Sequence, residues 1–387
     1  MIRLILLTDF TEAFAYNLLR GIRAYSQGRE PWVVCRMPPS YRQQYGIEGV
    51  LKWACEWKAD AIIGQFDDND PVELFREHGI VALAQDFRSR FTTIPNITSE
   101  YRLTGQMVAD FFLQKGFRHF AFYGYKDVVW SAERCEGFRE RVAAQGFGEN
   151  FREYQHPQLE NLWFYEPTPL ANWLRSLPHP TALMACDDNQ GNRITEICRV
   201  SGIRIPEEIA VMGVDNDEMT CNLSEPPLSS IKLNIEKGGY KAAQLIEQLI
   251  LDRDAAPYAD IVIAPVGIVD RLSTNIYATD DPYILVALQY IHQHLQAKIS
   301  VADIVRIVPL SRRLLEIRFK QVTGQPVYGY VFNLRMERFA QLLLATNDPI
   351  AEVAMNVGLV DYKNLARQFK SQRGCSPMEY RKRQQMK

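Results

Sequence analysis

Short, mainly apolar runs alternate with amphipathic stretches along most of the first 275 residues. Strands that read as continuous apolar runs are buried on both faces, which is typical of parallel sheets covered by helices. The apolar runs are Leu4–Leu7, Trp32–Cys35, Ala61–Gly64, Val81–Ala84, His119–Tyr123, Ala182–Cys186 and Ala210–Val214. The helical stretches between them include Ala15–Tyr25, Leu103–Lys115, Glu133–Ala144, Gln190–Val200 and Glu236–Leu251. The pattern predicts doubly wound α/β structure.

This alternation continues for longer than one open sheet usually requires. We therefore predict two consecutive lobes, the first ending near Asn96 and the second starting around Phe117. In open α/β sheets the ligand lies beyond the carboxyl ends of the strands. Two lobes that face each other would form a cleft there, lined by the polar residues that directly follow the apolar runs.

A polar segment, residues 271–282, ends the alternation, and the rest of the sequence is wholly helical in pattern. We predict a first, α/β domain over residues 1–274, a linker over 275–281 and a second domain over 282–387. From Pro282 to Lys387 there are 16 Lys and Arg against 7 Asp and Glu, whereas the first 281 residues hold 28 against 39. This asymmetry favours a polyanion such as DNA as the partner of the second domain, although solvated basic faces are also common.

The second domain contains an internal repeat. Ser300 with Asp303 forms a capping pattern for a first helix, and Ser311 can cap a basic helix over Arg312–Val322. A short helix, a tight turn and a basic helix are typical of a helix-turn-helix. About 50 residues later the same order returns as Ile350–Gly358 and Asp361–Lys370. Leu315, Phe319, Leu365 and Phe369 are expected to point inward, and an apolar helix over Val327–Leu344 joins the two copies.

The helical domain resembles the DNA-binding domain of the AraC/XylS family, whose two helix-turn-helix units enter successive major grooves. The matching residues are Ile350-Ala-Glu-Val-Ala, Gly358, Phe369-Lys370, Gly374, Ser376-Pro377 and Tyr380-Arg381. Leu365 departs from the usual Phe, and Val360 from the usual small polar residue. The recognition helices contact bases through their N-terminal parts. The expected DNA contacts are Arg312, Arg313, Glu316, Lys320, Tyr362, Lys363, Asn364 and Arg367. Arg335, Arg338 and the run Arg381-Lys-Arg383 are expected to be phosphate contacts or solubilising charge.

The first 270 residues resemble the sugar-binding core of LacI/GalR regulators and periplasmic sugar-binding proteins. The matches are Ala185–Asn189, Val211–Asn216 and Leu228–Ile231. LacI/GalR proteins carry their DNA-binding helices before this core, whereas here the core comes first. That order resembles bacterial xylose-operon regulators, and the resemblance includes Phe66–Asp68, Phe120–Gly124 and Gly213–Asn216. It implies a periplasmic-binding-protein-like two-lobed sensor followed by a double helix-turn-helix domain.

A sugar site requires side chains that form paired hydrogen bonds with neighbouring hydroxyls. Asp and Asn accept or exchange such bonds, and Arg donates two in parallel. Asp215, Asn216 and Asp187 follow predicted strands and Arg134 opens a helix, so these four are the leading candidates. Further candidates are Asp9, Asp67 and Glu133, together with Trp130, whose ring could stack on the sugar.

The resemblance implies a homodimer that binds operator DNA, takes D-xylose as its effector and contacts RNA polymerase to activate genes of pentose uptake and catabolism. We expect such a protein in the cytoplasm. Another monosaccharide or a phosphosugar remains an alternative effector. A sugar receptor that binds a protein through its basic tail is an alternative of another class.

The residue patterns disfavour several other classes of function. The sequence has no Gly-rich phosphate loop, nucleophile elbow or zinc signature, and the neighbouring carboxylates Asp67-Asp68 and Asp187-Asp188 would point in different directions. We therefore expect no enzyme activity, no cofactor and no metal. The seven cysteines include no C-x-x-C pair, as expected for reduced thiols. The apolar run at the N-terminus is too short for a signal peptide or a membrane span.

Overall fold

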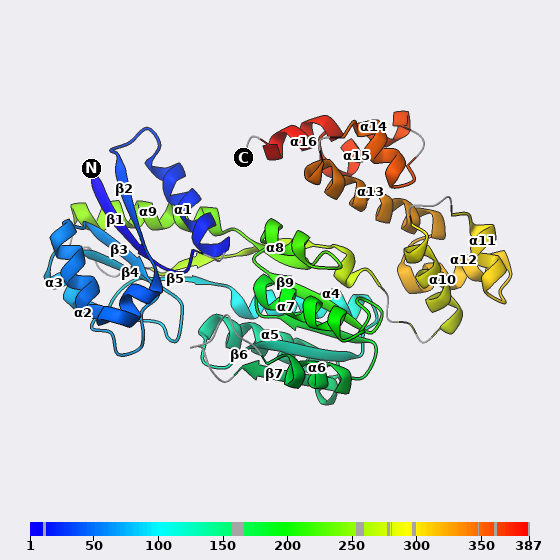
Figure 1. The fold of residues 1–387 in the computed structure, drawn as a ribbon, viewed down its shortest axis with the longest axis horizontal. Coiled ribbons are helices and arrows are strands. Elements are labelled where there is room, and N and C mark those ends of the chain that lie inside the picture. Colours follow the sequence, from blue (N-terminus) through cyan, green and yellow to red (C-terminus); the bar gives the residue numbers. More distant parts are fainter. Residues whose placement is uncertain are drawn as a thin grey trace. The chain divides into compact units, whose positions relative to one another are not determined.

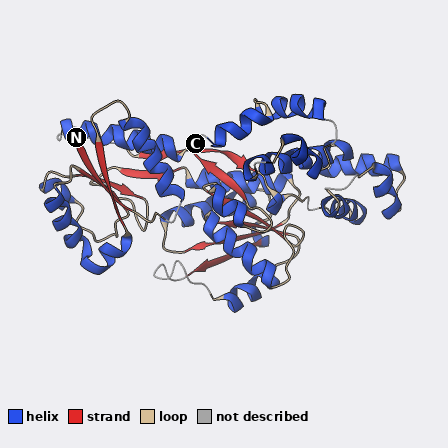
Figure 2. Cartoon of the chain, turned by 45° about the horizontal axis from the view of Figure 1, so that its top comes forward, coloured by secondary structure: helices blue, strands red, loops and turns tan. Residues whose placement is uncertain are grey.

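The computed structural model describes residues 1–10, 13–156, 166–252, 259–276, 279, 281–295, 299–346, 348–359 and 362–385. The chain divides into two compact units. One contains Met1–Gln114 and Arg118–Asn275, and the other contains Lys115–Phe117 and Ile276–Lys387. The strands lie in the first unit, while the C-terminal part of the chain is helical (Figures 1 and 2).

The first lobe of the sensor unit is built on a six-stranded parallel sheet. Its strands, in spatial order, are β11 (Ile261–Ile263), β5 (Asn96–Ser99), β4 (Val81–Gln85), β3 (Ala61–Gly64), β1 (Ile2–Leu7) and β2 (Trp32–Met37). The helices of this lobe are α1 (Ala13–Ser26), α2 (Pro39–Trp57), α3 (Glu73–Glu77) and α9 (Ile235–Leu251). Helices α2 and α3 bury their apolar residues against Ile5, Leu7 and Ile62 of the sheet. The predicted parallel α/β structure is confirmed.

The second lobe has another six-stranded sheet, parallel except for β12. Its order is β12 (Pro265–Val269), β10 (Ser229–Leu233), β9 (Ile209–Val214), β8 (Thr181–Ala185), β6 (His119–Tyr125) and β7 (Phe151–His156). Its helices are α4 (Tyr101–Gln114), α5 (Val129–Ala144), α6 (Pro167–Ser176), α7 (Asp188–Val200) and α8 (Glu218–Leu223), with the short turns η1 (Gly148–Asn150) and η3 (Leu272–Thr274).

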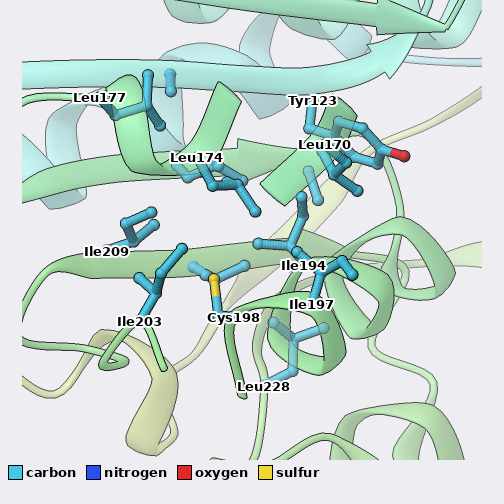
Figure 3. Packing of buried hydrophobic residues seen from close by; sticks show 14 of the residues in the cluster. Tyr123, Leu170, Leu174, Leu177, Ile194, Ile197, Cys198, Ile203, Ile209 and Leu228 are labelled. Carbon is cyan, nitrogen blue, oxygen red and sulfur yellow. The ribbon is translucent and has the colours of Figure 1, made fainter. Parts of the chain in front are cut away.

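One face of the second sheet is covered by a continuous apolar core. Leu170 and Leu174 of α6 and Ile194 and Ile197 of α7 pack on Tyr123 and the neighbouring strands (Figure 3). Burial of such side chains contributes about 1.5–3 kcal/mol each. This core holds the carboxyl ends of β6, β8 and β9 in fixed positions beside one another.

The two lobes are not consecutive in the chain, so that part of the prediction is wrong. The chain leaves the first lobe after β5 and returns to it with α9 and β11, and β12 then rejoins the second sheet. Helix α9 packs closely on α1. A Cβ added to Gly21 of α1 would lie only 1.9 Å from the carbonyl oxygen of Glu236 in α9, so the contact leaves no room for a side chain there. This packing between distant segments explains why the chain returns to the first lobe. The order of apolar runs along the sequence does not indicate it.

The C-terminal unit has two apolar clusters, one for each copy of the repeat. Its helices are α10 (Pro282–Gln293), α11 (Val301–Ile307), α12 (Arg312–Thr323), α13 (Val327–Ala345), α14 (Ile350–Asn356), α15 (Tyr362–Arg373) and α16 (Pro377–Gln385). The long helix α13 contributes to both clusters. The predicted inward positions are confirmed, since Leu315, Phe319, Leu365 and Phe369 are buried.

Local sequence signals determine the ends of these helices. Ser300 and Asp303 form the predicted capping box at α11, and Ser311 accepts a hydrogen bond from the Leu314 amide at the start of α12. Gly324 ends α12 with a φ of 72°, a left-handed conformation that glycine adopts without strain. Within the described residues, none of the helices combines the length and the apolar character needed to cross a membrane.

Candidate functional site

A cavity that opens to solvent lies at the carboxyl ends of strands from both lobes. Its position agrees with the expected site of ligand binding in open α/β sheets. Gln65 follows β3, Asp86 follows β4, and Asp215 follows β9. The residues that line the cavity are Ala13, Phe14, Gln65, Gln85, Asp86, Tyr101, Trp130, Arg134, Asp187, Asp188, Asn189, Asp215 and Asp217. The structure thus brings together four of the predicted sugar contacts: Asp215, Arg134, Asp187 and Trp130.

Arg134 lies near the start of α5 and is only 3% exposed. One Nη donates to the carbonyl oxygen of Cys186, and the other lies 3.5 Å from Asp215 Oδ1. The guanidinium carbon is 5.3 Å from the ring centres of both Tyr101 and Trp130, within range of cation–π attraction. Among the described residues the buried Nε has no hydrogen-bond partner. A buried donor left in this way is costly, so a ligand acceptor would be stabilised there.

Asp86 is 2% exposed and provides the complementary group. Its Oδ2 accepts hydrogen bonds from Thr98 Oγ1 at 2.6 Å and from Arg90 Nε at 3.0 Å. Its Oδ1 is buried and has no partner within the described part of the chain. Burial raises the pKa of this carboxyl, opposed by the hydrogen bond from Thr98 and the charge of Arg90. Two residues that line the cavity, Asp86 from the first lobe and Arg134 from the second, therefore each carry a buried polar atom without a partner among the described residues.

Three more carboxylates line the side of the cavity that belongs to the second lobe: Asp187 and Asp188, which are buried, and Asp215, which is half-buried. Asp187 caps α7, because its Oδ1 accepts from the Gln190 amide at 2.7 Å. Asp188 is fully engaged: one oxygen accepts from Ser230 Oγ at 2.6 Å and the other from the Asp217 amide at 2.7 Å. Burial raises the pKa of Asp215 to about 6 although the charge of Arg134 acts in the opposite direction.

The other predicted sugar contacts lie outside the lining of this cavity. Asn216 Oδ1 accepts a hydrogen bond from Arg271 Nη2 at 2.8 Å. Glu133 receives two hydrogen bonds from Arg90, at 2.8 and 2.9 Å. Asp67 pairs with Arg42 and lies 3.5 Å from Arg88. Asp9, which follows β1, is half-buried and also absent from the lining.

Several lining residues were missed in the sequence, among them Asp86, Gln85, Gln65, Phe14, Tyr101 and Asp188. For Asp86 the sequence carries a signal, because only Gln85 separates it from the apolar run Val81–Ala84, much as Asp187 comes directly after the run Ala182–Cys186. Tyr101 follows β5, whose polar sequence gave no strand signal. For Asp188 the sequence indicates only an adjacent pair of carboxylates, Asp187-Asp188.

The expected DNA-contacting side chains fall into three groups. Arg312, Arg313, Lys320 and Arg367 are exposed on α12 and α15. Glu316 is half-buried and its Oε2 accepts from the Val327 amide at 3.4 Å, where it caps the start of α13. The side chains of Tyr362, Lys363 and Asn364 lie outside the described part of the structure.

Two arginines that were expected to contact phosphates or to provide solubilising charge have structural contacts instead. Arg335 is half-buried and donates to the carbonyl oxygens of Leu295 at 3.0 Å and Gly358 at 3.1 Å. Arg381 donates to the carbonyl oxygens of Leu343 and Asp348 at 3.0 and 2.8 Å. Carbonyl groups left without partners at helix ends and turns attract such donors. These residues link the segments of the helical unit, which corrects the sequence interpretation.

Comparisons with known proteins agree with this architecture. Residues 109–274 match the periplasmic binding protein-like domain family, and residues 304–383 match a helix-turn-helix domain family. The xylose operon regulatory protein of Escherichia coli K12 is 27% identical, over 98% of this chain and 96% of its own length. The corresponding protein of Haemophilus influenzae is 30% identical, over 83% of this chain and 84% of its own length. The solved structure of a xylose-binding transcription activator matches with a TM-score of 0.69 and 26% identity, covering 98% of this chain and 97% of that one.

The two-lobed sensor fold and the double helix-turn-helix unit define a sugar-responsive transcriptional regulator. Its relatives regulate transcription and are not enzymes. On the identity and coverage just given, the chain belongs to the family of xylose operon regulatory proteins.

Proposed function

We propose that D-xylose, or a closely related pentose, binds in the cavity between the lobes and thereby controls DNA binding by the helical unit. The observation that carries this proposal is the pair of buried, unpartnered polar atoms, Asp86 Oδ1 and Arg134 Nε, in one cavity. A sugar hydroxyl is both a donor and an acceptor. One ligand with several hydroxyls can therefore satisfy the carboxylate of one lobe and the guanidinium of the other.

Aromatic side chains complete the requirements of a sugar site. Trp130, Tyr101 and Phe14 line the same cavity as the carboxylates. A pentose presents C–H groups on the faces of its ring and hydroxyls around its edge. Apolar surface together with a few placed polar groups suits such a ligand. Asp187 and Asp215, at the ends of two neighbouring strands, supply further acceptors for hydroxyl groups.

The charges of the lining argue against a phosphosugar. Five aspartates line the cavity, and Arg134 is the one cation among the lining residues that the structure describes. A phosphate group would lie close to several buried carboxylates, and repulsion between like charges is strong where water is excluded. An uncharged sugar avoids this cost while it makes charge-assisted hydrogen bonds with the same groups.

For the second half of the function, we propose that Arg312, Arg313 and Arg367 contact operator DNA. They are exposed on α12 and α15, the second helix of each helix-turn-helix unit. We further propose that two copies of the chain bind a paired site beside a promoter and contact RNA polymerase, so that xylose activates genes of pentose uptake and catabolism. Such a protein would act in the cytoplasm, where it can reach the chromosome.

The effector is tested by calorimetric titration of the full-length protein with D-xylose, L-arabinose, D-ribose and D-glucose. We expect saturable binding of D-xylose, lost in an Asp215→Ala variant. A variant of an exposed carboxylate outside the cavity, Asp68→Asn, is the matched control and should bind as the wild-type protein does. Heat released by D-glucose but not by D-xylose would refute the assignment to a pentose.

A further inference from the structure

The turn that follows β9 has a backbone conformation that L-residues rarely adopt. Asp215 has a φ of 100° and Asn216 a φ of 53°, although neither is glycine. Such a conformation costs about 1–3 kcal/mol for a residue and persists only where its surroundings impose it. Because Asp215 lines the cavity and Asn216 does not, the turn connects the cavity to the structure behind it.

Buried polar contacts hold this turn in place. The Asn216 amide donates to Ser230 Oγ at 3.0 Å, and Ser230 Oγ donates in turn to Asp188 at 2.6 Å. Arg271 Nη2 donates to Asn216 Oδ1 at 2.8 Å. Arg271 itself is only 7% exposed and donates through Nη1 to the carbonyl oxygen of Leu228 at 2.8 Å. The guanidinium therefore has one contact on the turn after β9 and another on the residue just before β10.

Arg271 also begins the last segment of the sensor unit, residues 271–275. Its amide donates to Ser229 Oγ at 2.7 Å. Two residues later, Ser273 Oγ donates to the carbonyl oxygen of Val211 at 2.6 Å and accepts from the Ser229 amide at 2.8 Å. The helical unit starts at Ile276, directly after this segment. The segment that leads to the DNA-binding helices is thus anchored to β9 and β10, next to the strained turn.

We propose that Asn216 and Arg271 are positioning residues that transmit the sugar-bound state of Asp215 to residues 271–275 and so to the DNA-binding unit. This inference rests on the proposed function of the cavity. A ligand changes an equilibrium only through different affinities for the two states. A hydroxyl bound to Asp215 favours one conformation of the turn. Since Asn216 is the next residue, that conformation fixes whether its Oδ1 meets Arg271.

Two substitutions at Asn216 separate this role from sugar contact and from folding. Asn216→Gly removes the acceptor for Arg271 and tolerates the positive φ. Asn216→Asp keeps an acceptor for Arg271, and Asp is among the residues that adopt a positive φ more readily. Arg271→Lys keeps the charge but replaces the guanidinium, whose two Nη atoms donate to Leu228 and Asn216, by a single amino group. Thermal melting of each variant checks that it folds.

The full-length variants are titrated with D-xylose by calorimetry and with a DNA duplex by fluorescence anisotropy, with and without D-xylose. The duplex is one that the wild-type protein selects from a random pool in the presence of D-xylose. We expect all variants to bind D-xylose within about threefold of the wild-type protein. The ratio of DNA affinities with and without sugar should fall at least about fivefold in Asn216→Gly and Arg271→Lys, since allosteric coupling is typically about 5–150-fold. Asn216→Asp should retain it.

The outcomes distinguish the two proposals. If Asn216→Gly and Arg271→Lys keep the wild-type ratio, the coupling role is refuted and the sugar site stands. If Asn216→Gly loses sugar affinity more than about tenfold, which is about 1.4 kcal/mol, Asn216 is a ligand contact and the coupling role is likewise refuted. If the wild-type protein binds no D-xylose, the proposed function fails first and the coupling role fails with it.

Discussion

Asp86→Asn is the substitution that examines the proposed sugar site most directly. In the wild-type protein Oδ2 accepts from Thr98 and Arg90, and Oδ1 has no partner among the described residues. Asn can keep its oxygen toward Thr98 and Arg90, which places its NH₂ group where Oδ1 was. A charged acceptor then becomes a neutral donor in the cavity, while the shape of the side chain hardly changes.

The size of the effect follows from the hydrogen bond that is lost. A hydrogen bond to a charged group contributes about 1.5–3 kcal/mol. Calorimetry should therefore show D-xylose binding weakened about 10- to 150-fold. Asp68→Asn makes the same chemical change on an exposed side chain outside the cavity and should leave the Kd unchanged. An unchanged Kd in Asp86→Asn would refute the assignment of Oδ1 to the sugar.

The stability of the sugar-free protein should not fall in Asp86→Asn, although its sugar affinity should. Burial raises the folded-state pKa of Asp86 above its unfolded value, so the folded protein binds more protons and loses stability as the pH rises through this range. At neutral pH the full cost of the buried charge is present. Arg90 keeps its two hydrogen bonds to Glu133 in the variant. Without sugar, the Tm of Asp86→Asn at pH 7 should equal or exceed that of the wild-type protein, and a large decrease would mean that the carboxylate stabilises the fold.

Three further outcomes are expected. Because burial raises the pKa of Asp215 to about 6, D-xylose affinity should fall as the pH drops from 7 to 5, by up to about tenfold per unit below pH 6, in calorimetric titrations at fixed ionic strength; constant affinity over this range would contradict a bond to the ionised group. Arg312→Ala and Arg367→Ala should each weaken DNA binding and reduce the slope of log K against log salt by about 1, with sugar affinity unchanged; equal loss of sugar binding would indicate misfolding. Gly358→Ala should lower the Tm of the helical unit, since its φ is 77° and a Cβ would lie 3.0 Å from the Arg335 guanidinium, at a cost of about 1 kcal/mol or more; an unchanged melting curve would contradict both the backbone strain and the close approach of Arg335.

The fold class could be predicted from the sequence because most buried strands are continuous apolar runs. Strand β5 is the instructive exception, since its residues Asn96–Ser99 are polar in three positions of four yet fully buried. Their side chains are satisfied by long-range partners: Thr98 bonds to Asp86, and Ser99 to the carbonyl oxygen of Ile263. A hydrophobic pattern does not predict a strand whose buried side chains are polar and satisfied by hydrogen bonds. The sequence pattern also does not predict that α9 returns to the first lobe, because this return depends on the contact of α9 with α1, far away in the sequence.

Part of the site could be predicted from the rule that ligands bind beyond the carboxyl ends of parallel strands. Asp187 and Asp215, which follow strands β8 and β9, line the cavity, and so does Asp86, which follows strand β4. The rule does not say in which direction a side chain points. Asn216 follows the same strand as Asp215, but the positive φ values of the two residues turn its carboxamide toward Arg271. Sequence position therefore identifies the loop, and the backbone conformation decides which of its residues can meet a ligand.

Several unfavourable features of the sensor unit lie at one site, and this is an argument for its function. Buried carboxylates with raised pKa values, an unpartnered guanidinium nitrogen and two positive φ angles all lie at or beside the cavity. Each of them destabilises the unliganded protein, and a structure tolerates such costs chiefly where function requires them. A sugar that satisfies the open hydrogen bonds stabilises only the arrangement in which Asp86, Arg134 and Asp215 reach it together. The free energy gained on binding is then available to shift the turn at Asp215, and through it the segment that leads to the DNA-binding helices.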